Sequence, residues 1–240
     1  MQIESRSNRR CVCCDCTRVT RDIIIMALTA ITYTLGRSLY VSMTNRANAL
    51  TLIASRGPGF VMPPSSGFSL LPDGFEPSPD EVVEAVRAAC DALDEPPSAL
   101  VFAGAGEPLL KLRGLLEVAD QLKNEHEHMR INTNGLVASA EAADTAARLK
   151  AAGVSAACVA LATADADQYL ALMEPEKLRF SPVHSLQLGH AEVVGFVSAC
   201  LDAGMDVECT AVAAPGVDID AAAGLATKLG ATFRARSWHP

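Results

Sequence analysis

The chain has 240 residues, of which 50% are hydrophobic, and it carries a formal net charge of −8 at pH 7 with a pI near 5.1. This length and apolar content suffice to bury one large core, so we expect a single folded domain. The acidic balance leaves no basic face for phosphates, and no apolar run is long enough to span a bilayer. We therefore expect neither nucleic acid nor a membrane as a partner.

The first thirty residues differ in composition from the rest of the chain. Arginine, serine and threonine dominate there, acids are few, and no periodic pattern extends a strand or helix. One interpretation is an organelle transit peptide, and another is an unstructured tail before a folded part that starts near Met26. We favour the tail, and we expect residues 31–240 to form the folded domain.

Cysteines fall into two groups. Four crowd into the amino-terminal segment: Cys11, Cys13, Cys14 and Cys16. Their overlapping C-x-x-C pairs offer two metal ligands, but no distant His or Cys pair completes a site, so no metal is assigned to them. The other four sit singly in apolar patterns: Cys90, Cys158, Cys200 and Cys209. Such positions are typical of reduced, buried thiols, so we expect an intracellular, reducing compartment, cytoplasmic unless residues 1–25 direct the chain to an organelle.

Regular structure is expected from residue 31 onward. Two strands, 31–34 and 39–44, flank a glycine turn. Residues 45–75 are rich in Gly and Pro and lack periodicity, which predicts a long loop of the kind that is usually functional or mobile. Ser78-Pro79-Asp80-Glu81 has the composition of a helix start, with Ser78 as the N-cap and Glu81 three residues later. The helix should run to about residue 93.

The stretch from Ser98 to Pro108 is the most informative part of the chain. A short apolar run bounded by turn signals predicts a strand buried on both faces, and it ends in Gly104-Ala105-Gly106-Glu107-Pro108 before an amphipathic helix. In α/β proteins, ligands bind at such strand–turn–helix units. Gly104 and Gly106 would allow a ligand to approach the backbone, and Glu107 could pair with an ammonium group. Pro108 suits the first helical turn. A plain structural turn explains the same residues.

The remaining segments continue the alternation of strand and helix. Strands are expected at 129–132, 154–162, 207–212 and 232–237, and helices at 140–152, on both sides of an insertion at 175–189, and at 218–229. Six alternations predict an α/β fold with a parallel sheet. His184 and His190, in or beside the insertion, are expected at the surface. His126 and His128, flanked by glutamates, are expected on a solvated polar face.

Arg234 and Arg236 alternate along the last expected strand, so their side chains should point the same way. If that direction is the interior of the fold, they would form an anion site for a carboxylate or phosphate. The alternative is that they pair with acids such as Glu208 across the sheet.

Several motifs in a fixed order resemble those of a known family. They are Tyr33–Gly36, Ser38–Val41, Thr44–Arg46, Gly104–Pro108, Arg130–Gly135, Pro215–Asp218 and Phe233–Arg236. In this order they resemble the radical SAM proteins encoded beside TatD-type nucleases, over nearly all of residues 31–238. The resemblance implies a partial (β/α)6 TIM-like barrel that binds S-adenosylmethionine at the carboxyl ends of its strands. It also implies that Gly104–Pro108 meets the methionine amino group and that Asn132 and Asn134 contact the ligand.

The chain departs from that family at the iron–sulfur motif. The family has Cys-x3-Cys-x2-Cys after the Thr-Asn-Arg segment, and the three thiolates hold a [4Fe–4S] cluster. The matching positions here are Ala47, Thr51 and Ala54, and neither an alanine nor a threonine hydroxyl replaces a thiolate. The resemblance therefore implies a diverged member without a cluster, a pseudoenzyme candidate. The amino-terminal cysteines are poor substitutes because their spacing differs.

Three hypotheses on function stay open at this point. The first is a binding protein that keeps a small-molecule pocket for S-adenosylmethionine or a related nucleotide. The second is an enzyme with non-radical chemistry, in which Glu107 acts as acid or base and the arginine pair orients an anionic substrate. The third is an interaction module that uses the loop of residues 45–75, with a protein partner that the sequence does not identify. Fold analogy does not choose among them.

Overall fold

The computed structural model describes residues 28–173 and 188–240. The expectations for the amino-terminal tail, its four cysteines, His184 and most of the insertion fall outside these residues. The described part contains one seven-stranded sheet in which the strands follow one another in sequence order, β1 to β7. β1 (Thr32–Leu35) and β2 (Ser38–Val41) form an antiparallel hairpin, and every later neighbouring pair is parallel.

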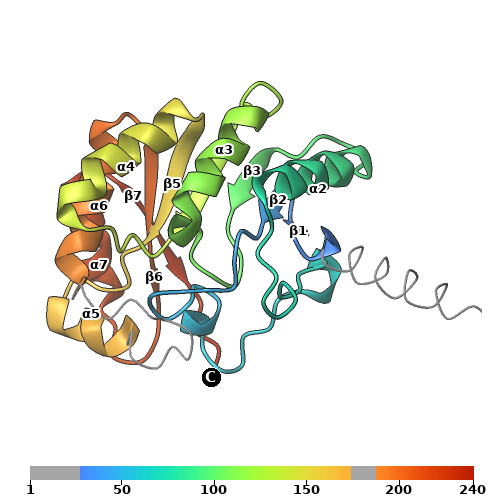
Figure 1. The fold of residues 1–240 in the computed structure, drawn as a ribbon. Coiled ribbons are helices and arrows are strands. Elements are labelled where there is room, and N and C mark those ends of the chain that lie inside the picture. The colour runs from blue at the N-terminus through green and yellow to red at the C-terminus, as the bar shows by residue number, and fades with distance from the viewer. Residues whose placement is uncertain (1–27, 174–187) are drawn as a thin grey trace, which may run out of the picture.

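Helices connect the parallel strands and lie along one side of the sheet (Figure 1). The strands are β3 (Ala99–Phe102), β4 (Met129–Thr133), β5 (Val154–Ala160), β6 (Asp206–Val212) and β7 (Thr232–Arg236). The helices are α2 (Pro79–Asp91), α3 (Leu112–Leu122), α4 (Ser139–Ala151), α5 (Ala166–Met173), α6 (His190–Asp202) and α7 (Ile219–Leu229). Short 3-10 turns are η1 (Ala54–Arg56), η2 (Pro64–Ser66) and η3 (Pro108–Lys111). This arrangement confirms the predicted α/β fold of the partial-barrel type.

Local sequence signals explain several of these boundaries. Ser78 caps α2 in a reciprocal capping box: its hydroxyl accepts from the Glu81 amide, and the Glu81 carboxylate accepts from the Ser78 amide. Gly230 ends α7 at a φ of +90°, a left-handed conformation that suits glycine. The helix expected directly after Pro108 instead starts as the 3-10 turn η3, and α3 follows from Leu112.

Strand side chains alternate between a face covered by helices and an inner face. Leu100, Phe102, Ile131 and Val159 pack on the first face into the core shared with helical side chains such as Leu115. The strand register aligns the residues of the inner face in rows: Tyr40, Val101 and Arg130; Asn132, Cys158, Glu208 and Thr232; and Thr210 with Arg234. Polar residues that reach this face therefore gather from distant parts of the sequence.

His190 does not lie at the surface as expected. Its side chain is buried, the ring packs near Tyr169, and Nε2 lies 2.9 Å from the Thr163 carbonyl oxygen. The apolar pattern of α6 carries this first residue into the core, and the carbonyl provides the partner that a buried imidazole needs. Within the described residues, no helix has the length and apolar character needed to cross a membrane.

Candidate functional site

Glu107 lies at the carboxyl end of the sheet, between the end of β3 and η3, where it holds two strand ends together. Only 4% of the residue is exposed. Its Oε1 accepts from the Thr133 hydroxyl at 2.7 Å and from the Leu109 amide at 3.0 Å, and its Oε2 accepts from the Asn134 amide at 2.8 Å. Burial raises the pKa of Glu107, and these three hydrogen bonds oppose the shift. Both oxygens of this carboxylate are therefore engaged within the protein.

Gly104 and Gly106 leave room for the close packing of neighbouring protein segments. A Cβ on Gly104 would lie 2.8 Å from the Ser42 hydroxyl oxygen, and one on Gly106 would lie 2.4 Å from the Arg46 carbonyl oxygen. The loop after β2 packs against Gly104–Pro108 at this point, and the Glu107 amide donates to the same Arg46 carbonyl at 2.8 Å. The glycines are thus needed for the close approach of the chain itself.

Asn134 belongs to the same loop junction. Its side-chain amide donates to Asn48 Oδ1 at 2.7 Å, and its own Oδ1 accepts from the Leu136 amide at 3.0 Å. Asn132 differs, although it lies only two residues away. It is 8% exposed, and its Oδ1 is buried without a hydrogen-bond partner among the described residues. Of the two asparagines that the resemblance singled out, Asn132 is the one with an uncommitted acceptor.

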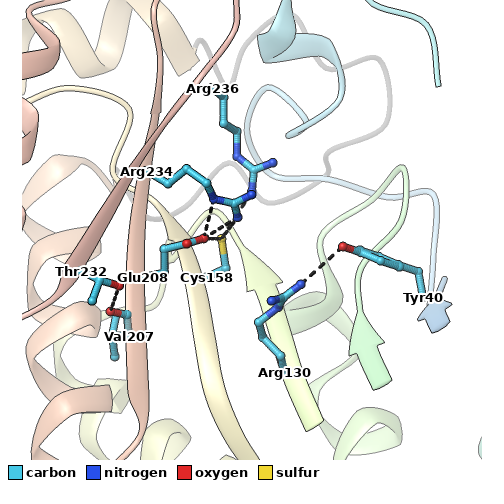
Figure 2. Close-up of polar contacts among 8 residues, drawn as sticks. All are labelled: Tyr40, Arg130, Cys158, Val207, Glu208, Thr232, Arg234 and Arg236. Carbon is cyan, nitrogen blue, oxygen red and sulfur yellow. Dashed lines mark hydrogen bonds and ion pairs between the residues drawn. The ribbon is translucent and has the colours of Figure 1, made fainter. Parts of the chain in front are cut away.

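The arginines of β7 converge on the inner face of the sheet (Figure 2). Arg234 forms an ion pair with Glu208, with its Nε 3.0 Å from Oε1. Arg236 Nη2 lies 3.4 Å from the sulfur of Cys158, and that thiol donates to Glu208 Oε1 at 3.4 Å. The two side chains share one face, as the alternation predicts, and Arg234 pairs with Glu208 across the sheet, as the second alternative predicts. Among the described residues, Arg236 has no carboxylate partner.

Two pKa shifts describe the electrostatics of this cluster. Burial would raise the pKa of Glu208, but the hydrogen bond and the charge of Arg234 outweigh it and lower the pKa below its ordinary value. Burial raises the pKa of Cys158 despite the nearby Arg236 guanidinium. The cluster thus contains two guanidinium ions, one carboxylate and one neutral thiol, and it is net positive.

A second polar group on the inner face contains Arg130 of β4 and Tyr40 of β2. Arg130 extends toward Tyr40 and donates from Nη2 to its hydroxyl at 3.4 Å (Figure 2). Its Nε is buried and has no hydrogen-bond partner in the part of the chain that the structure describes. The Tyr40 ring stacks on Tyr33 with centroids 5.1 Å apart. Uncommitted polar atoms therefore occur on the inner face at both β4 positions, 130 and 132.

The positions that the resemblance aligns with the cluster motif, Ala47, Thr51 and Ala54, have no iron donors. Ala47 is buried, Ala54 is exposed, and the Thr51 hydroxyl accepts from the Ala54 amide at 3.1 Å to close the turn η1. The described residues contain four free cysteines, and among them no group of three His, Cys, Asp or Glu side chains is placed to hold a metal ion. The donor set in these residues does not fit a [4Fe–4S] cluster, which requires thiolates brought together.

A separate groove lies at the opposite ends of the strands, beside the amino end of β3. It has a volume of about 530 Å³, and Cys90, Pro97, His126 and His128 contribute to its lining. His126 is half-buried with Nε2 4.0 Å from the Cys90 sulfur, and burial lowers its pKa. The prediction that His126 lies on a solvated polar face is therefore only partly correct. His128 is exposed as expected.

Comparison with protein-family models and with curated proteins finds no match. Solved structures of the radical S-adenosylmethionine methyltransferase TsrM from Kitasatospora setae do match. One, with cobalamin and a [4Fe–4S] cluster bound, has a TM-score of 0.52 and 11% identity over 82% of this chain and 34% of that chain. Another, with tryptophan substrate and the analogue aza-SAM bound, has a TM-score of 0.51 and 10% identity over 83% and 35%.

At this identity the match shows a shared fold, so the chain has a radical-SAM-like fold. The chain spans about a third of the length of the matched structures.

The sequence had indicated Arg234, Arg236 and Asn132 as candidate site residues, and the structure places all three on one face of the sheet. It had not indicated Cys158 or Arg130 as members of a site, and the only signal for them was an inward-facing register that becomes visible once the strands are paired.

Proposed function

We propose that the chain is a diverged radical-SAM-like protein that binds a small molecule through an anionic group on the inner face of β4 to β7, without a [4Fe–4S] cluster. The carboxyl end of the sheet, where Arg236 lies, is where ligands bind in open α/β folds. The candidate ligands are S-adenosylmethionine, through its carboxylate, and a related nucleotide, through its phosphate. Descent from the TatD-associated radical SAM lineage is part of this proposal, and it rests on the ordered motifs.

The observation that carries the proposal is that Arg236 has no carboxylate partner among the described residues. Its guanidinium points into the inner face, and its contact there is a neutral thiol rather than a carboxylate. A guanidinium offers a planar fork of donors that suits a carboxylate or phosphate. The unpartnered Oδ1 of Asn132 lies one strand away in the register row of Cys158 and supplies an acceptor for a ligand hydroxyl or amino group.

The cluster-free state is supported by the donor chemistry of the loop after β2. Ala47 and Ala54 carry no donor atom, and the Thr51 hydroxyl is occupied in the turn. The same loop is held by protein contacts, since Asn45 exchanges hydrogen bonds with the Leu71 backbone at 2.7 and 3.2 Å. These contacts fix the loop without iron ligands.

Glu107 is not included as a ligand contact or as a catalytic acid or base. Its two oxygens accept three hydrogen bonds from the protein, and the residue is almost fully buried. The enzyme hypothesis based on Glu107 therefore has no free carboxylate at that position. In the binding hypothesis, the arginines of β7 bind the ligand in place of Gly104–Pro108.

The test is calorimetric titration of iron-free protein with S-adenosylmethionine and, separately, with adenosine 5′-monophosphate. At least one should bind, and Arg236→Gln should weaken that binding about 10- to 150-fold, because a hydrogen bond to a charged group contributes about 1.5–3 kcal/mol. Arg113→Gln, on the exposed face of α3, is the matched control and should leave binding unchanged. Absence of heat with both ligands at millimolar concentration, or equal binding by the Arg236 variant, would overturn the proposal.

An interaction module remains the second candidate because of one observation on the loop of residues 45–75. Val61 and Leu70 are 77% and 62% exposed, and both belong to this loop. Exposed large apolar side chains in one segment are a feature of protein-binding surfaces. If neither small molecule binds, the double substitution Val61→Ser and Leu70→Ser tests this candidate by comparing protein capture with that of the unaltered chain.

A further inference from the structure

The loop after β2 and the residues after β7 are joined next to the arginine cluster. The His239 amide donates to the Arg56 carbonyl at 2.8 Å, and the Gly59 amide donates to the His239 carbonyl at 3.2 Å. The Arg56 side chain donates from Nε to the Ser237 carbonyl at 2.9 Å, directly after Arg236. Figure 1 shows the same arrangement, with the C-terminus beside the loop. We refer to Arg56–Phe60 and Ser237–Pro240 together as the clasp.

Glycines make this close contact feasible. Gly57 has a φ of +101°, and a Cβ there would lie 2.1 Å from the His239 carbonyl oxygen. A Cβ on Gly59 would lie 2.3 Å from the Pro240 carbonyl oxygen. Any side chain at either position would push the two segments apart. The Gly57-Pro58-Gly59 sequence is therefore fitted to hold Arg56 against the end of β7.

The clasp places a third guanidinium, that of Arg56, beside the end of β7. Arg56 is held on one side by the Phe60 ring, whose centroid is 4.5 Å from Cζ, and on the other by Ser237 and His239. Burial lowers the pKa of Arg56, and the charges of Arg236 and Arg234 lower it further. Arg56 thus lies beside the strand end that carries Arg234 and Arg236, and Glu208 is the carboxylate that the structure pairs with one of these three guanidinium ions.

We propose that Arg56, Arg234 and Arg236 together bind the phosphate group of the ligand, which makes the ligand a phosphate monoester such as a nucleotide. This inference rests on the proposed function and narrows its ligand class. Three guanidinium ions and one carboxylate leave two positive charges, which match a phosphate monoester of about −1.5 to −2 at neutral pH. S-adenosylmethionine carries a sulfonium, an ammonium and one carboxylate. Its net positive charge is repelled by the cluster.

The experiment uses Trp238, the only tryptophan in the chain, as a probe inside the clasp. Tryptophan fluorescence is titrated with inorganic phosphate and, at the same pH 7.5 and ionic strength, with acetate. Calorimetry in parallel records binding if the fluorescence does not change. Phosphate should bind at least tenfold more tightly than acetate. Arg56→Gln should weaken phosphate binding at least tenfold and remove most of this preference, while Arg113→Gln should bind phosphate as the unaltered chain does.

The outcomes separate this inference from the proposed function. Equal binding of phosphate and acetate, with loss in Arg236→Gln, would overturn the phosphate assignment and leave an anion site. Unchanged phosphate binding in Arg56→Gln would remove Arg56 from the site. Absence of phosphate binding, with S-adenosylmethionine or adenosine 5′-monophosphate still bound in the titration above, would overturn the phosphate assignment alone. If Arg56→Gln does not fold, Arg56→Lys keeps the charge without the planar fork, and it should weaken phosphate binding several-fold while the acetate affinity stays within twofold.

Discussion

Substitution of Glu107 by glutamine tests the structural role assigned to this carboxylate. Each carboxylate oxygen accepts from a backbone amide, Leu109 on one side and Asn134 on the other, at 3.0 and 2.8 Å. A glutamine has one oxygen and one nitrogen, and the nitrogen cannot accept. In either orientation, at least one buried N–H loses its partner.

The free energy of unfolding should therefore fall by about 2–3 kcal/mol, the cost of a lost hydrogen bond to a charged group in a buried site. For a chain of this size that corresponds to a melting temperature lower by about 4–12 °C. Glu117→Gln is the control, because its carboxylate is half-exposed and pairs with Arg113 on the surface, which contributes less than about 1 kcal/mol. Equal melting temperatures for Glu107→Gln and Glu117→Gln, measured by circular dichroism, would refute the reasoning.

Two further predictions concern packing and pH. Gly106→Ala should lower the melting temperature, since its Cβ would meet the Arg46 carbonyl at 2.4 Å; Gly114→Ala, whose nearest contact is 3.7 Å, should leave it unchanged or raise it slightly. A Gly106→Ala protein as stable as Gly114→Ala would contradict the packing. Because Arg234 lowers the pKa of Glu208 below its ordinary 4.5, this ion pair stabilises the fold above pH 4.5 and stops doing so as pH falls through the lowered pKa. Unfolding curves from pH 7 to 2 should show a smaller decrease in the free energy of unfolding for Glu208→Gln than for the unaltered chain. An identical decrease in the two proteins would disprove this contribution.

Sequence periodicity was sufficient to predict most of the fold, because the positions of helices and strands depend on local residue patterns. The capping box at Ser78 and the glycine after α7 are local signals, and both boundaries lie close to where they were expected. The predicted start of α3 was too early by one 3-10 turn, because Pro108 is compatible with the start of either helix type. The predicted surface position of His190 was wrong, because its place beside the insertion suggested exposure, whereas α6 buries its side chain against Tyr169.

The candidate site was harder to predict because its members come from different strands. Alternation along β7 was enough to place Arg234 and Arg236 on one face, but only the register brings them to Cys158 and Glu208. The role of Glu107 was not predictable from its motif, since its partners belong to β4 and to the loop that follows it. Arg56 was missed for the same reason, because its partners lie more than 180 residues away, at Ser237 and His239.

The measurement that tests the central claim most directly is the iron and acid-labile sulfide content after anaerobic reconstitution. It should be made on the full chain and on a chain that starts at residue 28. We expect substoichiometric iron in both and no charge-transfer absorption, because the loop positions that we propose to correspond to the cluster motif are Ala47, Thr51 and Ala54. About four irons per chain in the shorter protein, with the absorption of a [4Fe–4S] cluster, would contradict the account.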